Sequence, residues 1–186
     1  MVSLPLSWLV FKGLQLNKHL KYFLVFCVIP VLVILWWWGM FASAQITEQD
    51  APAYRYAYLE VEGPYSKLSG KQAEVLALLK AQKVNYNAPL TLMMSDPRVT
   101  QYKQRIARVG YIVTSDSVIS APLQVDSIPA RRVLSAQVKA HPLFAYGKTY
   151  GALVKYCEQQ GMGLQLPTVE IVEHSVLTVQ MPLRKE

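Results

Sequence analysis

The chain has 186 residues, which suits one domain with an added segment rather than two large domains. Its 19 basic and 12 acidic residues give a net charge of +7, and residues 1–44 carry +3 of it through Lys12, Lys18 and Lys21. The remaining +4 is spread along the rest of the chain. Because nucleic-acid-binding proteins typically carry a clustered basic stripe, the charge pattern does not predict a nucleic-acid partner.

Cysteines and histidines are too few and too scattered to indicate a metal site. Cys27 lies in an apolar run and Cys157 in an expected helix, so no disulfide is predicted. The 3 histidines are isolated, and no Cys/His cluster has zinc-like spacing. A glycine-rich loop that would cradle phosphates is missing too. The sequence therefore predicts neither a metal site nor a cofactor.

An uncharged apolar run covers residues 22–40. As an α-helix it would be about 28 Å long, close to the hydrocarbon core of a bilayer, so the sequence predicts one transmembrane helix over residues 22–44. Lysines precede the run, and the first charges after it are Glu48 and Asp50. The positive-inside rule then predicts a single-pass protein of the inner (cytoplasmic) membrane, with its domain in the periplasm or otherwise outside the cytoplasm. Residues 1–21 are expected to be a cytoplasmic segment of amphipathic character.

Two other interpretations of this region stay open. Residues 42–44 read Ala-Ser-Ala, which fits the small-residue pattern of a signal-peptidase site, so the run is alternatively a cleaved signal peptide. The run is longer than the apolar region of most signal peptides, which favours an uncleaved anchor. The second alternative is the reverse orientation, with the domain in the cytoplasm. Polar residues 45–53 are interpreted as a linker to the domain.

Residues 54–186 alternate between strand patterns and helix patterns. The first set of expected elements is a strand at 54–62, a helix at 67–83, and strands at 90–94 and 109–114. The second set is a strand at 132–139, a helix at 146–160, and strands at 168–172 and 176–181. The two sets have the same order, which indicates an internal repeat.

The repeat predicts two copies of one strand–helix–strand–strand unit, at about residues 54–114 and 131–183. An offset of 78 residues superposes the copies and places Leu92 on Glu170. Two such units predict an α+β domain in which an antiparallel sheet has two helices on one face, after the transmembrane helix. The groove between the units is the expected place for a pocket.

Several segments of the domain share their order and spacing with a known family. They are the strand leading into Gly63-Pro64-Tyr65, LTLMMSDP at 90–97, VGYIV at 109–113, IPARRVLSAQVKAHP at 128–142, the helix with Tyr146 and Tyr150, LPTVEIV at 166–172 and QMPL at 180–183. In this order they resemble the GyrI-like family, the effector-binding domain of multidrug-sensing transcription activators. The resemblance covers about residues 54–183. It implies a duplicated strand–helix–strand–strand fold whose groove binds small, often cationic or aromatic molecules.

The resemblance also implies where the site lies. A glutamate on a strand of the second repeat commonly sits in the groove of such proteins, and Glu170 is its match here. The family often has a tyrosine two residues later, where this chain has Val172, so one aromatic wall is missing. A branch of the family hydrolyses electrophilic small molecules with this glutamate and aromatic neighbours. Membrane-anchored members also exist, including some that act as adaptors rather than enzymes. No helix-turn-helix pattern precedes the domain in this sequence, which argues against a transcription factor.

Glu170 also stands out from its own surroundings. Strand alternation puts it on one face of a short apolar strand, where a lone carboxylate is costly unless it is solvated, paired or neutralised. There it can attract a cation or act as a general base, or else it simply faces solvent or pairs with a basic residue. The residues expected to bind a ligand with Glu170 are Tyr58, Tyr65, Met94, Tyr111, Tyr146 and Tyr150. The alternative for each tyrosine is a place in the core. Met93 is a candidate wall beside Met94, and one of these two methionines is expected to pack under the helices instead.

Three functions therefore stay open. The first is a membrane-anchored, non-catalytic domain that binds a small cationic or aromatic molecule in the groove. The second is an accessory subunit that docks onto a membrane protein complex through its transmembrane helix. The third is a glutamate-dependent hydrolase of electrophilic small molecules. An open groove with a buried Glu170 favours the first or the third function, whereas a groove closed by bulky side chains favours the second.

Overall fold

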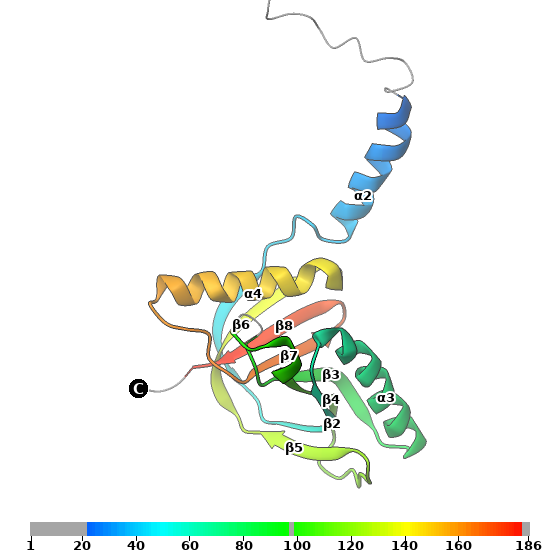
Figure 1. Ribbon diagram of the computed structural model, residues 1–186, viewed down its shortest axis with the longest axis vertical. Helices are drawn as coiled ribbons and strands as arrows, with labels where there is room; N and C mark the ends of the chain where they lie inside the picture. Colours follow the sequence, from blue (N-terminus) through cyan, green and yellow to red (C-terminus); the bar gives the residue numbers. More distant parts are fainter. Residues whose placement is uncertain (1–21, 97–98, 184–186) are drawn as a thin grey trace, which may run out of the picture. The chain divides into compact units, whose positions relative to one another are not determined.

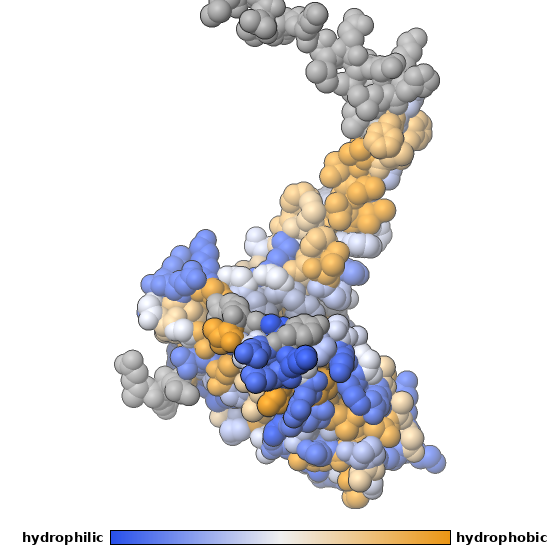
Figure 2. Space-filling view, in the orientation of Figure 1, coloured by the Kyte–Doolittle hydropathy of each residue, from blue (hydrophilic) through white to orange (hydrophobic). Residues whose placement is uncertain are grey.

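The computed structural model describes residues 22–96 and 99–183. The chain divides into two units, Met1–Met40 and Phe41–Glu186. In the described part of the first unit, a π-helix at Leu24–Val28 runs directly into α2, Ile29–Trp37 (Figure 1). This helical segment is apolar on every side, and Figure 2 shows its orange surface.

The described helical part of the apolar run ends at Trp37. α2 has 9 residues, and no helix within the described parts of the chain is long and apolar enough to cross a bilayer. The transmembrane helix predicted over residues 22–44 is therefore not found among the described residues. The predicted cytoplasmic segment, residues 1–21, lies outside them.

The linker predicted at residues 45–53 is wrong. Gln45–Ala51 form strand β1, which pairs antiparallel with β6, Arg131–Lys139. Only Ala51 of β1 is buried, so the strand is held by backbone hydrogen bonds along β6 rather than by a row of apolar side chains. A polar edge strand of this kind has no apolar alternation, which is the pattern that indicates a strand in a sequence.

The second unit has eight strands and two long helices among its described residues. The strands are β1, β2 (Tyr54–Glu62), β3 (Tyr86–Met93), β4 (Ile106–Val113), β5 (Gln124–Ile128), β6, β7 (Thr168–Glu173) and β8 (Val176–Pro182). The helices are α3 (Leu68–Ala81) and α4 (Pro142–Gln159), with short 3₁₀ turns at Tyr65–Lys67 and Tyr102–Gln104. The α+β prediction is confirmed, and β5 is a further strand that was not predicted.

All eight strands form one antiparallel sheet in the order β1-β6-β8-β7-β3-β4-β2-β5. The order is symmetric about the contact between β7 and β3. On one side lie β3, β4 and β2, and on the other lie β7, β8 and β6, each set with its own helix. The domain therefore consists of two strand–helix–strand–strand units around a pseudo-twofold axis, each extended by one edge strand.

The register at the centre of the sheet corrects the alignment of the two units by one residue. Thr91 pairs with Glu170, and Leu92 pairs with Val169. Paired residues share a face, so Leu92 and Glu170 lie on opposite faces, and Leu92 packs into a buried cluster on the far side. The prediction that Leu92 occupies the place of Glu170 is thus wrong, and Thr91 is the counterpart. A slip of one residue exchanges the two faces of a strand.

The sheet is strongly curved. β1 and β5 lie at opposite edges, yet β1 is joined to β2 by residues 52–53, and β5 to β6 by residues 129–130. Connections this short reach about 10 Å, whereas a flat sheet would put β1 and β2 about 29 Å apart. The Nε2 atom of Gln180 on β8 donates to the hydroxyl of Tyr54 on β2 at 3.1 Å, across the three strands between them. The face with these residues is therefore enclosed by the curvature.

The two helices cover the other face of the sheet. Val75 and Leu79 of α3 pack on the first unit, and Leu153 of α4 packs on β6 and β8 of the second. α4 begins at Pro142, before the predicted start at residue 146. Proline suits the first turn because its missing N–H needs no partner there, and the Nδ1 atom of His141 accepts from Leu143 N at 3.3 Å.

Candidate functional site

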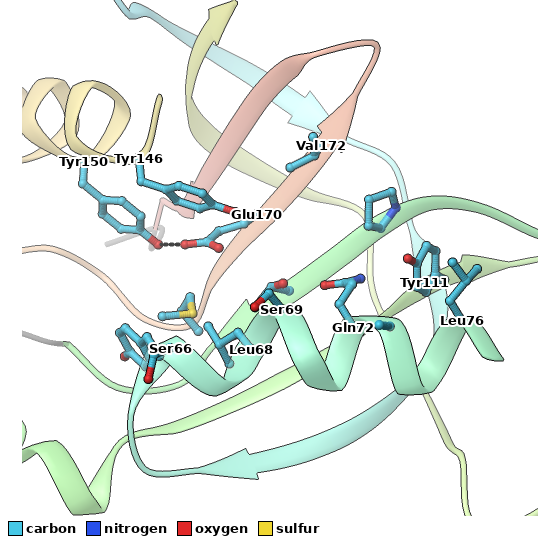
Figure 3. Close-up of a pocket in the computed structure, with 15 residues that line it drawn as sticks. Ser66, Leu68, Ser69, Gln72, Leu76, Tyr111, Tyr146, Tyr150, Glu170 and Val172 are labelled. Atoms are coloured by element: carbon cyan, nitrogen blue, oxygen red, sulfur yellow. Dashed lines mark hydrogen bonds between the residues drawn. The ribbon is translucent and has the colours of Figure 1, made fainter. Parts of the chain in front are cut away.

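A cavity of about 770 Å³ lies on the helix side of the sheet, between α3 and α4 (Figure 3). Its volume falls in the range of pockets that hold drug-sized ligands. β3, β4 and β7 supply the floor through Pro89, Thr91, Met93, Tyr111, Glu170 and Val172. The cavity is open to solvent rather than closed by bulky side chains, since residues such as Ser69 and Ala73 on its wall are exposed.

Glu170 is the only charged residue among the described residues that line this cavity. It reaches from β7 toward Tyr146 and Tyr150 of α4, and only 6% of its surface is exposed (Figure 3). Burial raises the pKa of its carboxyl from 4.5 to about 7 because the charged form loses its water. The hydrogen bond from Tyr150 opposes this rise. Near neutral pH the group is therefore close to half charged.

Two tyrosines of α4 hold and surround this carboxyl. The hydroxyl of Tyr150 donates to Glu170 Oε1 at 2.6 Å and lies 3.1 Å from Thr168 Oγ1. Burial and the neighbouring carboxylate raise the pKa of Tyr150, and the same two causes raise that of Tyr146 to about 12. Both phenols thus stay protonated at physiological pH. Tyr150 is consequently a permanent donor that fixes the orientation of Glu170.

Most of the predicted ligand-binding residues meet at this cavity. Its lining includes Tyr65, Tyr111, Tyr146, Tyr150 and Glu170. The hydroxyl of Tyr65 donates to Ser95 O at 2.8 Å, and Arg105 lies over the Tyr65 ring at 5.2 Å from its centroid. These contacts hold the ring at the end of the cavity where the 3₁₀ turn leads into α3.

The structure places the other two predicted residues elsewhere. Tyr58 is on the far face of the sheet, where its ring lies 5.2 Å from that of Tyr56 and under the guanidinium of Arg108. Met94 follows β3 and does not line the cavity, whereas Met93 does. In both places the alternation of side chains along a strand decides which residue meets the cavity.

Sequence reasoning missed the wall that α3 supplies. Ser66, Ser69 and Gln72 line the cavity at a spacing of three residues, and the labelled side chains of Ser69 and Gln72 point into it (Figure 3). Gln72 Nε2 donates to Gly110 O at 2.7 Å. A polar row on a helix usually marks a solvated face, so the residue types alone gave no reason to place them in a pocket.

The arrangement offers groups that can bind a ligand. Within residues 22–96 and 99–183, no group of three or more His, Cys, Asp or Glu side chains is placed to hold a metal ion. The cavity combines one carboxyl, the faces and hydroxyls of tyrosines, and apolar side chains such as Leu76 and Met93. Val172 lines it at the position where the resemblance implied a lost aromatic wall.

Comparison with known families agrees with this geometry. The model of the GyrI-like small-molecule-binding domain matches residues 44–175, more than half of the chain. The chain belongs to the GyrI-like family. A search of curated proteins found no match. The GyrI-like domain of this chain is thus a small-molecule-binding domain, as the resemblance implied.

Solved structures share the fold at low sequence identity. The cryo-EM structure of an EcmrR–DNA complex matches with a TM-score of 0.62 and 15% identity, over 93% of this chain and 70% of that chain. SAV2435 bound to tetraphenylphosphonium matches with a TM-score of 0.56 and 10% identity, over 75% of this chain and 94% of that one. A hydrolase from Listeria innocua matches with a TM-score of 0.53 and 8% identity, over 76% and 93%. These likenesses show the fold alone.

Proposed function

We propose that the GyrI-like domain binds a small organic cation with an aromatic or apolar body and does not catalyse its conversion. The observation that carries this proposal is the buried carboxyl of Glu170 in a cavity whose other described lining residues are uncharged. A buried carboxylate without a counter-ion is costly, and a bound cation supplies that counter-ion. The tyrosines add aromatic faces, which attract cations.

The shape of the cavity supports a ligand of this kind. It is open and large enough for a drug-sized molecule, which favours binding over a purely structural role. SAV2435, which shares the fold, was solved with the aromatic cation tetraphenylphosphonium. Tetraphenylphosphonium is therefore a suitable first probe for this chain.

The proposal is tested by calorimetric titration of tetraphenylphosphonium at pH 8, where Glu170 is mostly ionised. Glu170→Gln keeps the size of the side chain and removes its charge, so we expect it to weaken binding by about tenfold or more. The neutral triphenylphosphine oxide should be affected much less. Glu173→Gln is the matched control because Glu173 lies on the same strand, is exposed and does not line the cavity. Equal affinities of wild type and Glu170→Gln would overturn the proposal.

A hydrolase of electrophilic small molecules is the second candidate. It is favoured by the hydrogen bond between Tyr150 and Glu170 and by a carboxyl pKa of about 7, which suits a general base at neutral pH. The test is turnover of an epoxide by wild type and by Glu170→Gln. If wild type turns the epoxide over and Glu170→Gln does not, the domain is a hydrolase rather than a non-catalytic binding domain.

We also propose that residues 22–40 anchor the protein in the inner membrane, with the domain in the periplasm. The support is the apolar, exposed surface of this segment, where Phe26 is 73% and Trp37 87% exposed. The protein should stay in the membrane fraction after alkaline carbonate washing. A mature chain that begins at Gln45 would contradict the anchor. Protease access to the domain only from the cytoplasmic side would contradict the orientation.

An accessory role in a membrane complex remains the alternative to ligand binding. It requires a partner protein that docks through the apolar segment or the domain surface. Purification in mild detergent tests it, since a stoichiometric partner protein should then stay with the chain. The open cavity and the buried Glu170 favour ligand binding over this role.

A further inference from the structure

The cavity has polar groups at two ends, and the proposed function uses only one of them. Glu170 marks the first end, on the floor beside α4. Gln72 and Ser69 of α3 mark the second, on the opposite wall (Figure 3). Neither of these two side chains carries a charge, so the second end differs in kind from the first.

The amide of Gln72 is held in one orientation. Its Nε2 atom donates to the carbonyl oxygen of Gly110 at 2.7 Å. The reversed amide would set two carbonyl oxygens against each other, so the contact fixes which atom faces the cavity. Gln72 Oε1 is turned toward the cavity in Figure 3. The second end therefore presents a hydrogen-bond acceptor.

The sheet register gives the separation of the strand positions that lie under the two ends. Glu170 on β7 pairs with Thr91 on β3, and Thr91 pairs with Val109 on β4, next to Gly110. Two strand spacings therefore separate Glu170 from the backbone group that holds Gln72, a distance of about 10 Å. The floor between them is mostly apolar, with Pro89 among its residues.

We propose that Gln72 selects ligands that carry an uncharged hydrogen-bond donor, such as a hydroxyl or an amide N–H, about 10 Å from their cationic group. This inference rests on the proposed function, because Glu170 must first fix the cationic end. The intervening floor requires an apolar body. The ligand class is thus an elongated monocation with a neutral polar tail, and the hydroxyl of Ser69 flanks that tail.

The energetics of burial explain why the tail matters. A ligand that fills the cavity displaces water from Gln72 Oε1, and an apolar tail leaves this acceptor without a partner. A hydroxyl tail replaces the water with a direct hydrogen bond. We expect the difference to be about fivefold in affinity, in line with the net value of one hydrogen bond.

The test uses trimethylammonium ions with alkyl chains of increasing length, each ending in a hydroxyl or in a methyl group of matching size. Affinities are measured by calorimetry at pH 8 on the full chain. The hydroxyl should give its largest advantage, about fivefold, at the chain length that reaches Gln72. Gln72→Met should abolish this advantage. Gln159→Met is the matched control, since Gln159 is exposed on α4 and does not line the cavity, and it should keep the advantage.

A second variant guards against a folding defect in the first. Gln72→Glu places a carboxylate at the far end of the cavity. Compared with wild type, this variant should shift the ratio of affinities by about tenfold in favour of a bis-trimethylammonium ion over the hydroxyl-tailed monocation of the same length. Melting curves check that both variants fold.

The outcomes separate this inference from the proposed function. A wild-type protein that shows no hydroxyl advantage at any length, while Glu170→Gln still weakens the alkyl ions, overturns the inference alone. An advantage that persists in folded Gln72→Met also overturns it. If none of the ions depends on Glu170, the proposed function fails and the inference fails with it.

Discussion

The two halves of the domain share a fold and differ in their chemistry. The second half brings Glu170 and two tyrosines of α4 to the cavity, whereas the first half has Thr91 in the place of Glu170 and polar, uncharged residues along α3. The pseudo-twofold axis therefore relates the backbones of the two halves, whereas their charged side chains differ. A duplicated unit can in this way build a cavity with two unlike ends, which suits a ligand with two unlike ends.

The largest expected effect is on the free energy of unfolding. It comes from removing the carboxyl of Glu170, the group that distinguishes the two halves. The pKa of Glu170 is raised from 4.5 to about 7, so the folded protein holds this proton more tightly than the unfolded chain. The stability contributed by this group is greatest below pH 4.5 and is lost as the pH rises to about 7. The loss is on the order of 3 kcal/mol.

Glu170→Gln should not show this loss and should therefore be more stable than wild type at pH 8. Urea denaturation of both proteins between pH 4 and pH 8 measures the difference in the free energy of unfolding. If the free energies of unfolding of the two proteins change in parallel between pH 4 and pH 8, the carboxyl of Glu170 is not held in a desolvated site.

The next effect is also on the free energy of unfolding. It concerns Gly110, because only the first half has a glycine at this position of the sheet. Gly110 pairs with Tyr58 and Leu90, the same place that Gln180 occupies in the second half. A Cβ atom at Gly110 would collide with the backbone carbonyl of Ala57. We expect Gly110→Ala to lower the free energy of unfolding by about 2 kcal/mol, because backbone must move to make room.

Gly147→Ala is the control for this prediction. Gly147 lies within α4, and an added Cβ would meet nothing within 4 Å. Alanine should therefore raise stability by about 0.5–1 kcal/mol through its better helix propensity. Thermal and urea denaturation compare the two variants. A Gly110→Ala protein as stable as wild type would contradict the close strand approach in the first half.

The smallest of these effects comes from the hydrogen bond that orients Glu170. Tyr150→Phe removes the donor that opposes the rise in the pKa of Glu170, so this pKa should increase further. At pH 7 fewer carboxyls are then charged, and a cation should bind a few-fold more weakly, with recovery at higher pH. Carbon NMR of the Glu170 carboxyl follows the titration. Tyr146→Phe is the matched control, and an unchanged midpoint in Tyr150→Phe would refute the role given to its hydroxyl.

The core of the fold was predictable because its strands alternate and its helices carry apolar stripes. The bounds predicted for 54–62 agree with β2, and the expected strands at 168–172 and 176–181 lie within β7 and β8. β1 and β5 were missed because edge strands can be polar and are held by backbone hydrogen bonds. The curvature that brings the two edges together depends on the strand order, which no local pattern reveals.

The candidate site was predictable in part for a related reason. Glu170 was identified because a lone carboxylate in an apolar strand is unusual. Tyr58 and Met94 were misplaced because the face of a strand changes with each residue, and an offset of one residue could not be detected from the repeat. Ser69 and Gln72 were missed because a helix wall that borders a cavity looks like a helix wall that borders solvent.

The most direct test of the central claim is the number of protons released when a permanent cation binds. Titrations of tetraphenylphosphonium in buffers of different ionisation enthalpy give this number. With a carboxyl pKa of about 7 that a tenfold preference for the ionised form lowers by about one unit, wild type should release about 0.4 proton per cation at pH 6 and about 0.1 at pH 8. Glu170→Gln should release none at either pH. Proton release that is absent from wild type at pH 6, or that survives in Glu170→Gln, would contradict the claim that Glu170 is the counter-ion of the ligand.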